Sequence, residues 1–284
     1  MPLFPLSVAA SLANAVLNSG HSLLKRLVLR KKQVNYVEYA LLYELAGALL
    51  LLPFALYDLS LPRSLDAWAY AGLAAAAWSV YTLLSAYNTK HVEASRLVLL
   101  NRFKIIWIVL LASIFLGEAI TSKKLVSGAL IIGGSFLLSF ERVKLSFDRQ
   151  SLIIFGSVLI AAIANLADKA AINHFPIFFY AFLTYLVPAL AIYAYSRPNL
   201  PRAYNNLSGN KKWLLLTLVV QTLGYLALLY ALSIAEAVTV LLIAEMQVPL
   251  TAFGGILFLH EKKDLKKVFA ALALVVAGSA LLIL

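Results

Sequence analysis

Long runs of apolar residues, separated by short polar segments, follow one another along the whole chain. Most runs approach the roughly 20 residues that a helix needs to cross the ~30 Å hydrocarbon core of a bilayer. They do not alternate apolar and polar positions as the strands of a membrane barrel do, so we predict helices. The predicted helices span residues 3–24, 36–57, 65–87, 94–116, 125–140, 152–171, 175–195, 213–234, 237–259 and 268–284.

These ten predicted helices make the chain an all-α membrane protein, and the polar segment 141–150 divides them into two sets of five. Sliding one half onto the other by 143 residues places Glu93 on Glu236, among several coincidences that indicate an internal repeat. We therefore expect two five-helix repeats, residues 1–145 and 146–284. Because five is an odd number, consecutive copies insert with opposite orientation and surround a central cavity, as in many secondary transporters.

Composition excludes a water-soluble globule, because 62% of the 284 residues are apolar and only 13% are charged, against roughly 45–50% and about 25% in soluble domains. The net charge of +11 lies mainly in short segments between the apolar runs, such as Lys25 and Arg26. Lysine and arginine in such segments flank membrane helices, so we do not expect a nucleic-acid partner.

The basic residues gather in the loops after the first, third, fifth, seventh and ninth helices. Since positive loops stay in the cytoplasm, we expect a multi-pass protein of the cell membrane with both termini outside.

The chain contains no cysteine, which excludes disulfides, thiolate nucleophiles and sulfur-ligated metals. His260 and Glu261 lack the second histidine of a metalloprotease motif, and no glycine-rich phosphate loop occurs. We therefore expect neither an enzyme nor a cofactor or metal site.

Two segments near the end of the first half resemble a known family. Residues 115–121 (FLGEAIT), followed by 128–134 (GALIIGG), are similar to the end of an EamA repeat in the drug/metabolite transporter superfamily, with a weaker echo at 257–261. His260 replaces a glycine of the common pattern, and the fourth helix lacks a proline matching Pro249. The resemblance implies ten helices and a cavity lined chiefly by the first, third, fourth, sixth, eighth and ninth. It does not name the cargo.

Four charged residues lie inside predicted helices, where each costs roughly 2.5–3.5 kcal/mol on insertion and therefore usually faces a cavity or a partner. They are Glu44, Arg102, Lys104 and Glu245. The 143-residue slide places Arg102 on Glu245, so we expect these two to face one cavity. Residues 102 and 104 differ by about 200° on a helix, so Lys104 should turn towards Glu44 or a neighbouring helix. The alternative is that buried ion pairs only fix helix register.

A second set of candidates comprises polar and aromatic residues spaced three or four positions apart, which places each group on one helix face. We expect them to line the cavity and to bind or relay the substrate or a proton. They are Asn14, Asn18 and His21; Trp78 and Tyr81; Asn165 and Asp168; and Gln221 and Tyr225. Alternatively, they form interhelical hydrogen bonds or packing contacts, and Asp168 forms a solvated pair with Lys169.

The leading hypothesis is a secondary transporter that moves a small polar or zwitterionic metabolite, such as an amino acid or amine, by alternating access. Arg102 would hold a carboxylate or balance Glu245, and Glu245 would bind an amine or exchange a proton. A proton-coupled exporter of organic cations is the alternative, and a non-transporting scaffold and an intramembrane enzyme using His21 and Asp168 are less favoured. Small residues such as Gly134 and Gly278 allow close packing of the fifth and tenth helices, within a monomer or in a homodimer.

Overall fold

The computed structural model describes residues 3–29, 34–138, 148–208, 211–259 and 265–283. His260, Glu261 and most of the segment 141–150 lie outside these ranges. The described chain contains helices and no strand. The helices are α1 (Leu3–Leu29), α2 (Tyr36–Tyr57), α3 (Leu65–His91), α4 (Ala94–Leu100), α5 (Phe103–Phe115), α6 (Ser122–Leu137), α7 (Arg149–Ile172), α8 (Ile177–Ser196), α9 (Leu200–Ser208), α10 (Lys211–Ile234), α11 (Ala237–Ala244), α12 (Gln247–Leu259) and α13 (Leu265–Ile283).

Each of the ten predicted helices overlaps at least one observed helix, and α2 has the predicted bounds. Three differences matter for the site. The predicted helices 94–116 and 237–259 are each broken in two, and α1 continues five residues beyond the predicted end at Leu24. The short helix α9 was not predicted; it carries Pro201 in its first turn, where proline is tolerated.

Polar side chains at several helix starts explain where the helices begin. Asn35 accepts a hydrogen bond from the Val37 amide at 2.8 Å, and Asp148 accepts one from the Ser151 amide at 2.9 Å. Such caps satisfy amides that the first helical turn leaves without partners.

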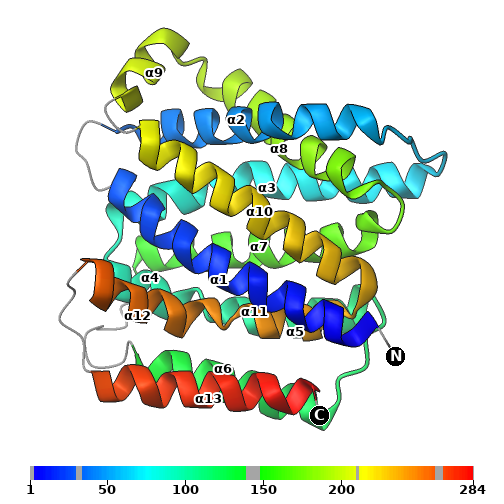
Figure 1. Ribbon diagram of the computed structural model, residues 1–284, viewed down its shortest axis with the longest axis vertical. Coiled ribbons are helices and arrows are strands. Elements are labelled where there is room, and N and C mark those ends of the chain that lie inside the picture. Colours follow the sequence, from blue (N-terminus) through cyan, green and yellow to red (C-terminus); the bar gives the residue numbers. More distant parts are fainter. Residues whose placement is uncertain (1–2, 30–33, 139–147, 209–210, 260–264, 284) are drawn as a thin grey trace.

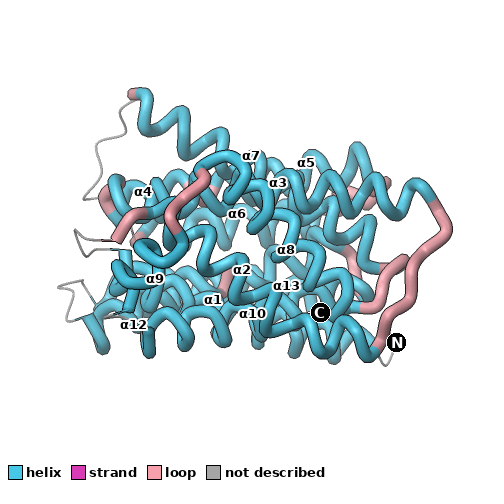
Figure 2. The backbone as a smooth tube through the Cα atoms, turned by 90° about the horizontal axis from the view of Figure 1, so that it is seen from above, coloured by secondary structure: helices cyan, strands magenta, loops and turns pink. Residues whose placement is uncertain are grey.

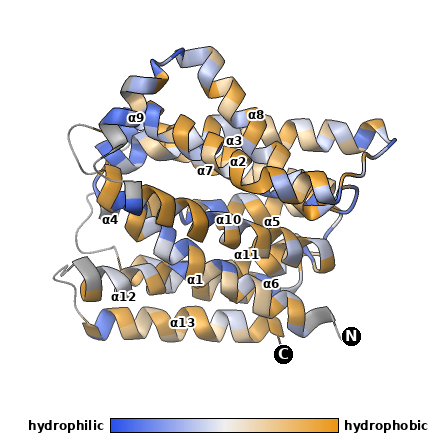
Figure 3. Cartoon of the chain, turned by 45° about the horizontal axis from the view of Figure 1, so that its top comes forward, coloured by the Kyte–Doolittle hydropathy of each residue, from blue (hydrophilic) through white to orange (hydrophobic). Residues whose placement is uncertain are grey.

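Most helix axes lie roughly parallel or antiparallel to one another, and the loops gather at the two ends of the bundle (Figures 1 and 2). Both chain termini lie at the same end, opposite the end where α4 begins and α12 stops (Figure 1). Hydrophobic residues cover the outer helices, as along α13 in Figure 3. An even number of membrane crossings would place both termini on the same side of the membrane, and the two termini do lie at the same end of the bundle.

Large apolar side chains are exposed along the outer faces of the helices. Leu49 is 61% exposed, Ile114 71% and Phe115 74%. A soluble monomer rarely exposes so much apolar surface, whereas lipid covers it without cost. By length and composition, seven helices of the described chain can cross a membrane, the pair α11 and α12 being taken as one of them.

The breaks between α4 and α5 and between α11 and α12 are tight turns in which amides bond three residues back instead of four. Arg102 donates to the Leu99 carbonyl at 3.2 Å, and Val248 donates to the Glu245 carbonyl at 3.0 Å. Pro249 accounts for the second break, because proline has no amide hydrogen and its ring clashes with the carbonyl four residues earlier, that of Glu245. The first break has no proline.

The helix packing is matched between the two halves. α1 packs on α10 as α7 packs on α3, and α1 packs on α12 as α7 packs on α5. Two further contacts, α2 with α8 and α6 with α13, join corresponding helices of the two halves.

Two glycines show how closely α6 and α13 approach. A Cβ atom on Gly134 would lie 2.9 Å from the Ala271 carbonyl oxygen, and one on Gly278 would lie 2.9 Å from the Ser127 carbonyl oxygen. The two contacts are related by a shift of 144 residues, and they pair the helices in opposite directions. The close packing of these glycines is therefore internal to the chain.

We predict that Gly134→Ala lowers the melting temperature of the purified protein in detergent, because overpacking at a backbone contact costs about 1–3 kcal/mol. Gly133→Ala is the matched control, since a Cβ there meets nothing within 4 Å. Both variants replace a helical glycine by alanine and gain the same helix propensity, up to ~1 kcal/mol, so the difference between them reports the packing. Equal melting temperatures for the two variants would contradict the packing described.

Candidate functional site

A cavity of about 710 Å³ lies inside the bundle. Its walls come from α1, α3, α4, α5, α7, α10, α11 and α12, the helices that the family resemblance implied, together with α2 and α8. The lining extends to Leu138 after α6 and to Lys267 in α13, both at the end opposite the termini. A volume of this size suits a small molecule.

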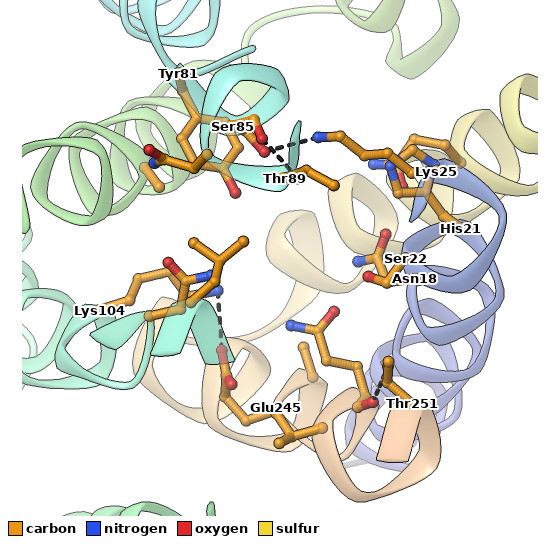
Figure 4. Close-up of a pocket in the computed structure, with 18 of the residues that line it drawn as sticks. Asn18, His21, Ser22, Lys25, Tyr81, Ser85, Thr89, Lys104, Glu245 and Thr251 are labelled. Atoms are coloured by element: carbon orange, nitrogen blue, oxygen red, sulfur yellow. Dashed lines mark hydrogen bonds and ion pairs between the residues drawn. The ribbon is translucent and has the colours of Figure 1, made fainter. Parts of the chain in front are cut away.

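Arg102 and Glu245 meet inside this cavity, where their side chains form a buried ion pair. Lys104 approaches the other carboxylate oxygen of Glu245 at 2.9 Å (Figure 4). Glu245 is only 1% exposed, so one deeply buried carboxylate is paired with two cations. We refer to Arg102, Lys104 and Glu245 as the ion triad.

The expectation that Arg102 and Lys104 point in different directions was wrong. It assumed a continuous helix, whereas Arg102 lies in the break and Lys104 lies in the first turn of α5. At the break amides bond three residues back, so the spacing of a regular α-helix does not apply, and both side chains reach Glu245. Lys104 was expected to turn towards Glu44 or a neighbouring helix. It pairs with Glu245 and not with Glu44.

Glu44 and Lys25 lie on other walls of the cavity. Glu44 accepts a hydrogen bond from the Thr82 hydroxyl at 2.6 Å. The Lys25 ammonium donates to the Ser85 hydroxyl at 2.8 Å, as Figure 4 shows. Sequence reasoning missed Lys25, because it treated the neighbouring basic residues as a loop. The polar spacing of Asn14, Asn18 and His21 continues to Lys25 four residues later, and this signal could have identified it.

The polar face of α1 lines the cavity as expected. Asn18, His21 and Ser22 lie across from Glu245 in Figure 4. The Asn14 amide donates to the Gly224 carbonyl at 2.8 Å, which joins α1 to α10. Asn14 therefore makes an interhelical contact as well as lining the cavity.

Asn165 and Gln221 also line the cavity, from α7 and α10. The Asn165 amide donates to the Ala161 carbonyl at 2.6 Å, one turn earlier in its own helix. Among the described residues, the buried side-chain oxygen of Gln221 has no hydrogen-bond partner. A buried amide oxygen without a partner is an unused acceptor at the wall of the cavity.

Asp168 is the predicted site residue that does not line the cavity. It is fully buried and accepts hydrogen bonds from Tyr180 at 2.7 Å, Tyr225 at 3.1 Å and the Trp78 indole at 3.0 and 3.2 Å. The suggested solvated pair with Lys169 was wrong, because Lys169 bonds backbone carbonyls at the end of α10. Asp168 instead holds Trp78 and Tyr225 in place from behind the wall.

An aromatic wall forms one side of the cavity, and we define it as Tyr43, Tyr185, Tyr225, Trp78 and Tyr81, all of which line the cavity. Successive ring centroids along this series are 6.1, 6.0, 5.9 and 5.5 Å apart. Trp78, Tyr81 and Tyr225 were predicted, whereas Tyr43 and Tyr185 were not. The family resemblance did not place their helices, α2 and α8, among those that chiefly line the cavity, although Glu44 on the second helix was a candidate.

At the end that carries the termini, the two halves are joined by a polar network. The Glu118 carboxylate accepts hydrogen bonds from the amides of Ala237 and Val238 at 2.6 and 3.0 Å, and so caps α11. Lys124 pairs with Glu236 at 2.9 Å. None of these residues lines the cavity.

The EamA-like transporter family model matches this chain twice, at residues 11–140 and 149–284. The chain belongs to this family. A solved structure described only as a crystal structure of a protein has a TM-score of 0.69 to it and 14% sequence identity, over 96% of each chain. That likeness concerns the fold alone. No curated protein matches the sequence.

Membership of the EamA family makes the protein a multi-pass membrane transporter, with a small molecule as its cargo. Within the described residues, no group of three or more histidine, aspartate or glutamate side chains could hold a metal ion. The chemistry that the cavity offers is therefore that of charged, amide, hydroxyl and aromatic side chains.

Proposed function

We propose that this EamA protein is a secondary active transporter that moves a small zwitterionic metabolite by alternating access between two inverted repeats. The repeats would be residues 1–145 and 146–284. The matched packing of the halves, the antiparallel contact of α6 with α13 and the equivalent breaks in two helices support this arrangement. In such transporters the substrate binds between the repeats, where discontinuous helices meet.

Ten crossings are proposed from the seven apolar helices and three further segments. These are α1, whose polar face lines the cavity, the broken pair α4 and α5, and the 16-residue α6. Each would cross in spite of its polar face, break or short length, because it packs within the bundle instead of facing lipid on all sides.

The described conformation would be open towards the end where the cavity lining reaches Lys267, and closed at the other end by Glu118 and its partners. The cavity end carries most of the basic loops, which positive-inside reasoning assigns to the cytoplasm. We therefore propose a protein of the cell membrane that faces inward here and has both termini outside.

An epitope tag at either terminus should be accessible to an impermeant antibody in intact cells. A tag inserted between Gly209 and Asn210 should become accessible only after permeabilisation. This position lies in the sequence between α9 and α10, in one of the basic segments assigned to the cytoplasm. Detection of the terminal tags only after permeabilisation would reverse the proposed orientation.

The observation that carries the substrate class is a central cavity with charges of both signs in its walls, namely Lys25, Arg102 and Lys104 with Glu44 and Glu245. A zwitterion satisfies both signs, whereas an exporter of organic cations would be favoured by acids and aromatic residues alone. The cavity also argues against a closed, non-transporting scaffold. An enzyme using His21 and Asp168 would need both at one reactive atom, and only His21 lines the cavity.

In proteoliposomes, counterflow should exceed that of protein-free vesicles for at least one member of a panel of L-α-amino acids. Thr251→Trp should lower it, because the larger side chain would project into the cavity that Thr251 lines. Phe253→Trp is the matched control, because Phe253 is partly exposed on the same helix and does not line the cavity. Counterflow of bulky organic cations only, or of no member of a broad metabolite panel, would overturn the proposal.

A further inference from the structure

The charges in the middle of the cavity divide into paired and unpaired groups. Arg102 and Lys104 both pair with the Glu245 carboxylate in the ion triad. Lys25 and Glu44 form no ion pair within the part of the chain that the structure describes, and their polar partners are the hydroxyls of Ser85 and Thr82. Two opposite charges in the cavity are therefore available to a ligand.

The two available charges reach one face of the same helix. Thr82 and Ser85 both lie on α3, three positions apart, so their side chains are neighbours with about 5–6 Å between Cβ atoms. Lys25 approaches this face from α1 and Glu44 approaches it from α2. An ammonium and a carboxylate from the protein are thus held about one helical turn apart on a cavity wall.

Such a pair of charges matches the two ends of an α-amino acid. Its ammonium and carboxylate are attached to one carbon atom, so they can meet a carboxylate and an ammonium that lie a helical turn apart. Glu44 is only 4% exposed, and a buried charge with a single hydroxyl partner is costly until a cation approaches it. A bound amino acid would offset that cost at both charges.

The aromatic wall adjoins this pair of charges. Tyr43 directly precedes Glu44, and the wall continues from it through Tyr185 and Tyr225 to Trp78. Aromatic faces attract ammonium groups and pack against apolar side chains. The wall therefore favours an amino acid whose side chain is apolar.

We propose, on the basis of the transport function above, that Lys25 with Ser85 binds the carboxylate of an α-amino acid and that Glu44 with Thr82 binds its ammonium group. The ion triad then serves the architecture of the cavity, and the substrate lies between α1, α2 and α3 against the aromatic wall.

Isothermal titration calorimetry of the purified full-length protein in detergent tests this assignment. The probes are L-leucine, L-phenylalanine and L-tryptophan, each with its carboxamide and its N-acetyl form. Wild-type protein should bind at least one free amino acid, and should bind both derivatives of it about tenfold or more weakly, as expected for loss of one charge-assisted hydrogen bond.

Variants should respond in a crossed pattern. Lys25→Met should weaken binding of the free amino acid about tenfold or more and leave the carboxamide little changed, whereas Glu44→Gln should do the same and leave the N-acetyl form little changed. Lys25→Arg and Glu44→Asp should restore part of the affinity. Lys90→Met and Glu38→Gln are the controls, because neither residue lines the cavity.

If an amino acid binds but both variants weaken all three forms equally, Lys25 and Glu44 have a structural role and the assignment fails while the transport function stands. If no amino acid binds to wild-type protein, the substrate class is wrong. Counterflow of another metabolite would then still support the transport function. No counterflow of any metabolite in a broad panel would refute the transport function as well.

Discussion

The ion triad is the interaction on which the rest of the structure depends. Arg102 and Lys104 come from the broken helix of the first half, and Glu245 comes from the broken helix of the second. Removing one partner from a buried ion pair costs about 3–5 kcal/mol, because the remaining charge has no compensation. The two breaks are therefore held together in the interior, and the cavity opens beside them.

The cavity follows from this arrangement. Helices that are interrupted at the same depth cannot fill the interior as continuous apolar helices would, and polar groups that would be unsatisfied in lipid instead line a hollow. Within the described residues Lys25 and Glu44 form no ion pair, whereas Arg102 and Lys104 are both paired with Glu245. The ion triad, which maintains the architecture, and the charges of Lys25 and Glu44, which we propose bind the ligand, thus lie in one cavity.

Much of the fold could be predicted from hydrophobic patterning, because a helix in lipid must be apolar over its full length; the bounds of α2 at Tyr36 and Tyr57 were found in this way. The burial cost of charge likewise indicated Arg102 and Glu245. The breaks could not be predicted from local sequence alone. Pro249 explains the second, whereas the first contains no proline, and Arg102 at that break pairs with a residue of the other half.

Site residues were misjudged where sequence neighbours and spatial neighbours differ. Lys169 follows Asp168 in the sequence but bonds the end of α10, while the partners of Asp168 come from α3, α8 and α10. Lys25 lies beyond the predicted end of the first helix, so it resembled a membrane-flanking charge. The helix α1, which packs against α10, continues past Lys25 to Leu29.

Thermal unfolding of Arg102→Gln, Glu245→Gln and the double variant in detergent tests the role of the triad most directly. Glu245→Gln leaves the buried Arg102 and the partly exposed Lys104 without their carboxylate, whereas the double variant leaves only Lys104. The account predicts that Glu245→Gln has the lowest melting temperature and that the double variant recovers part of the loss. Additive losses, or a Glu245→Gln variant as stable as the wild type, would contradict it.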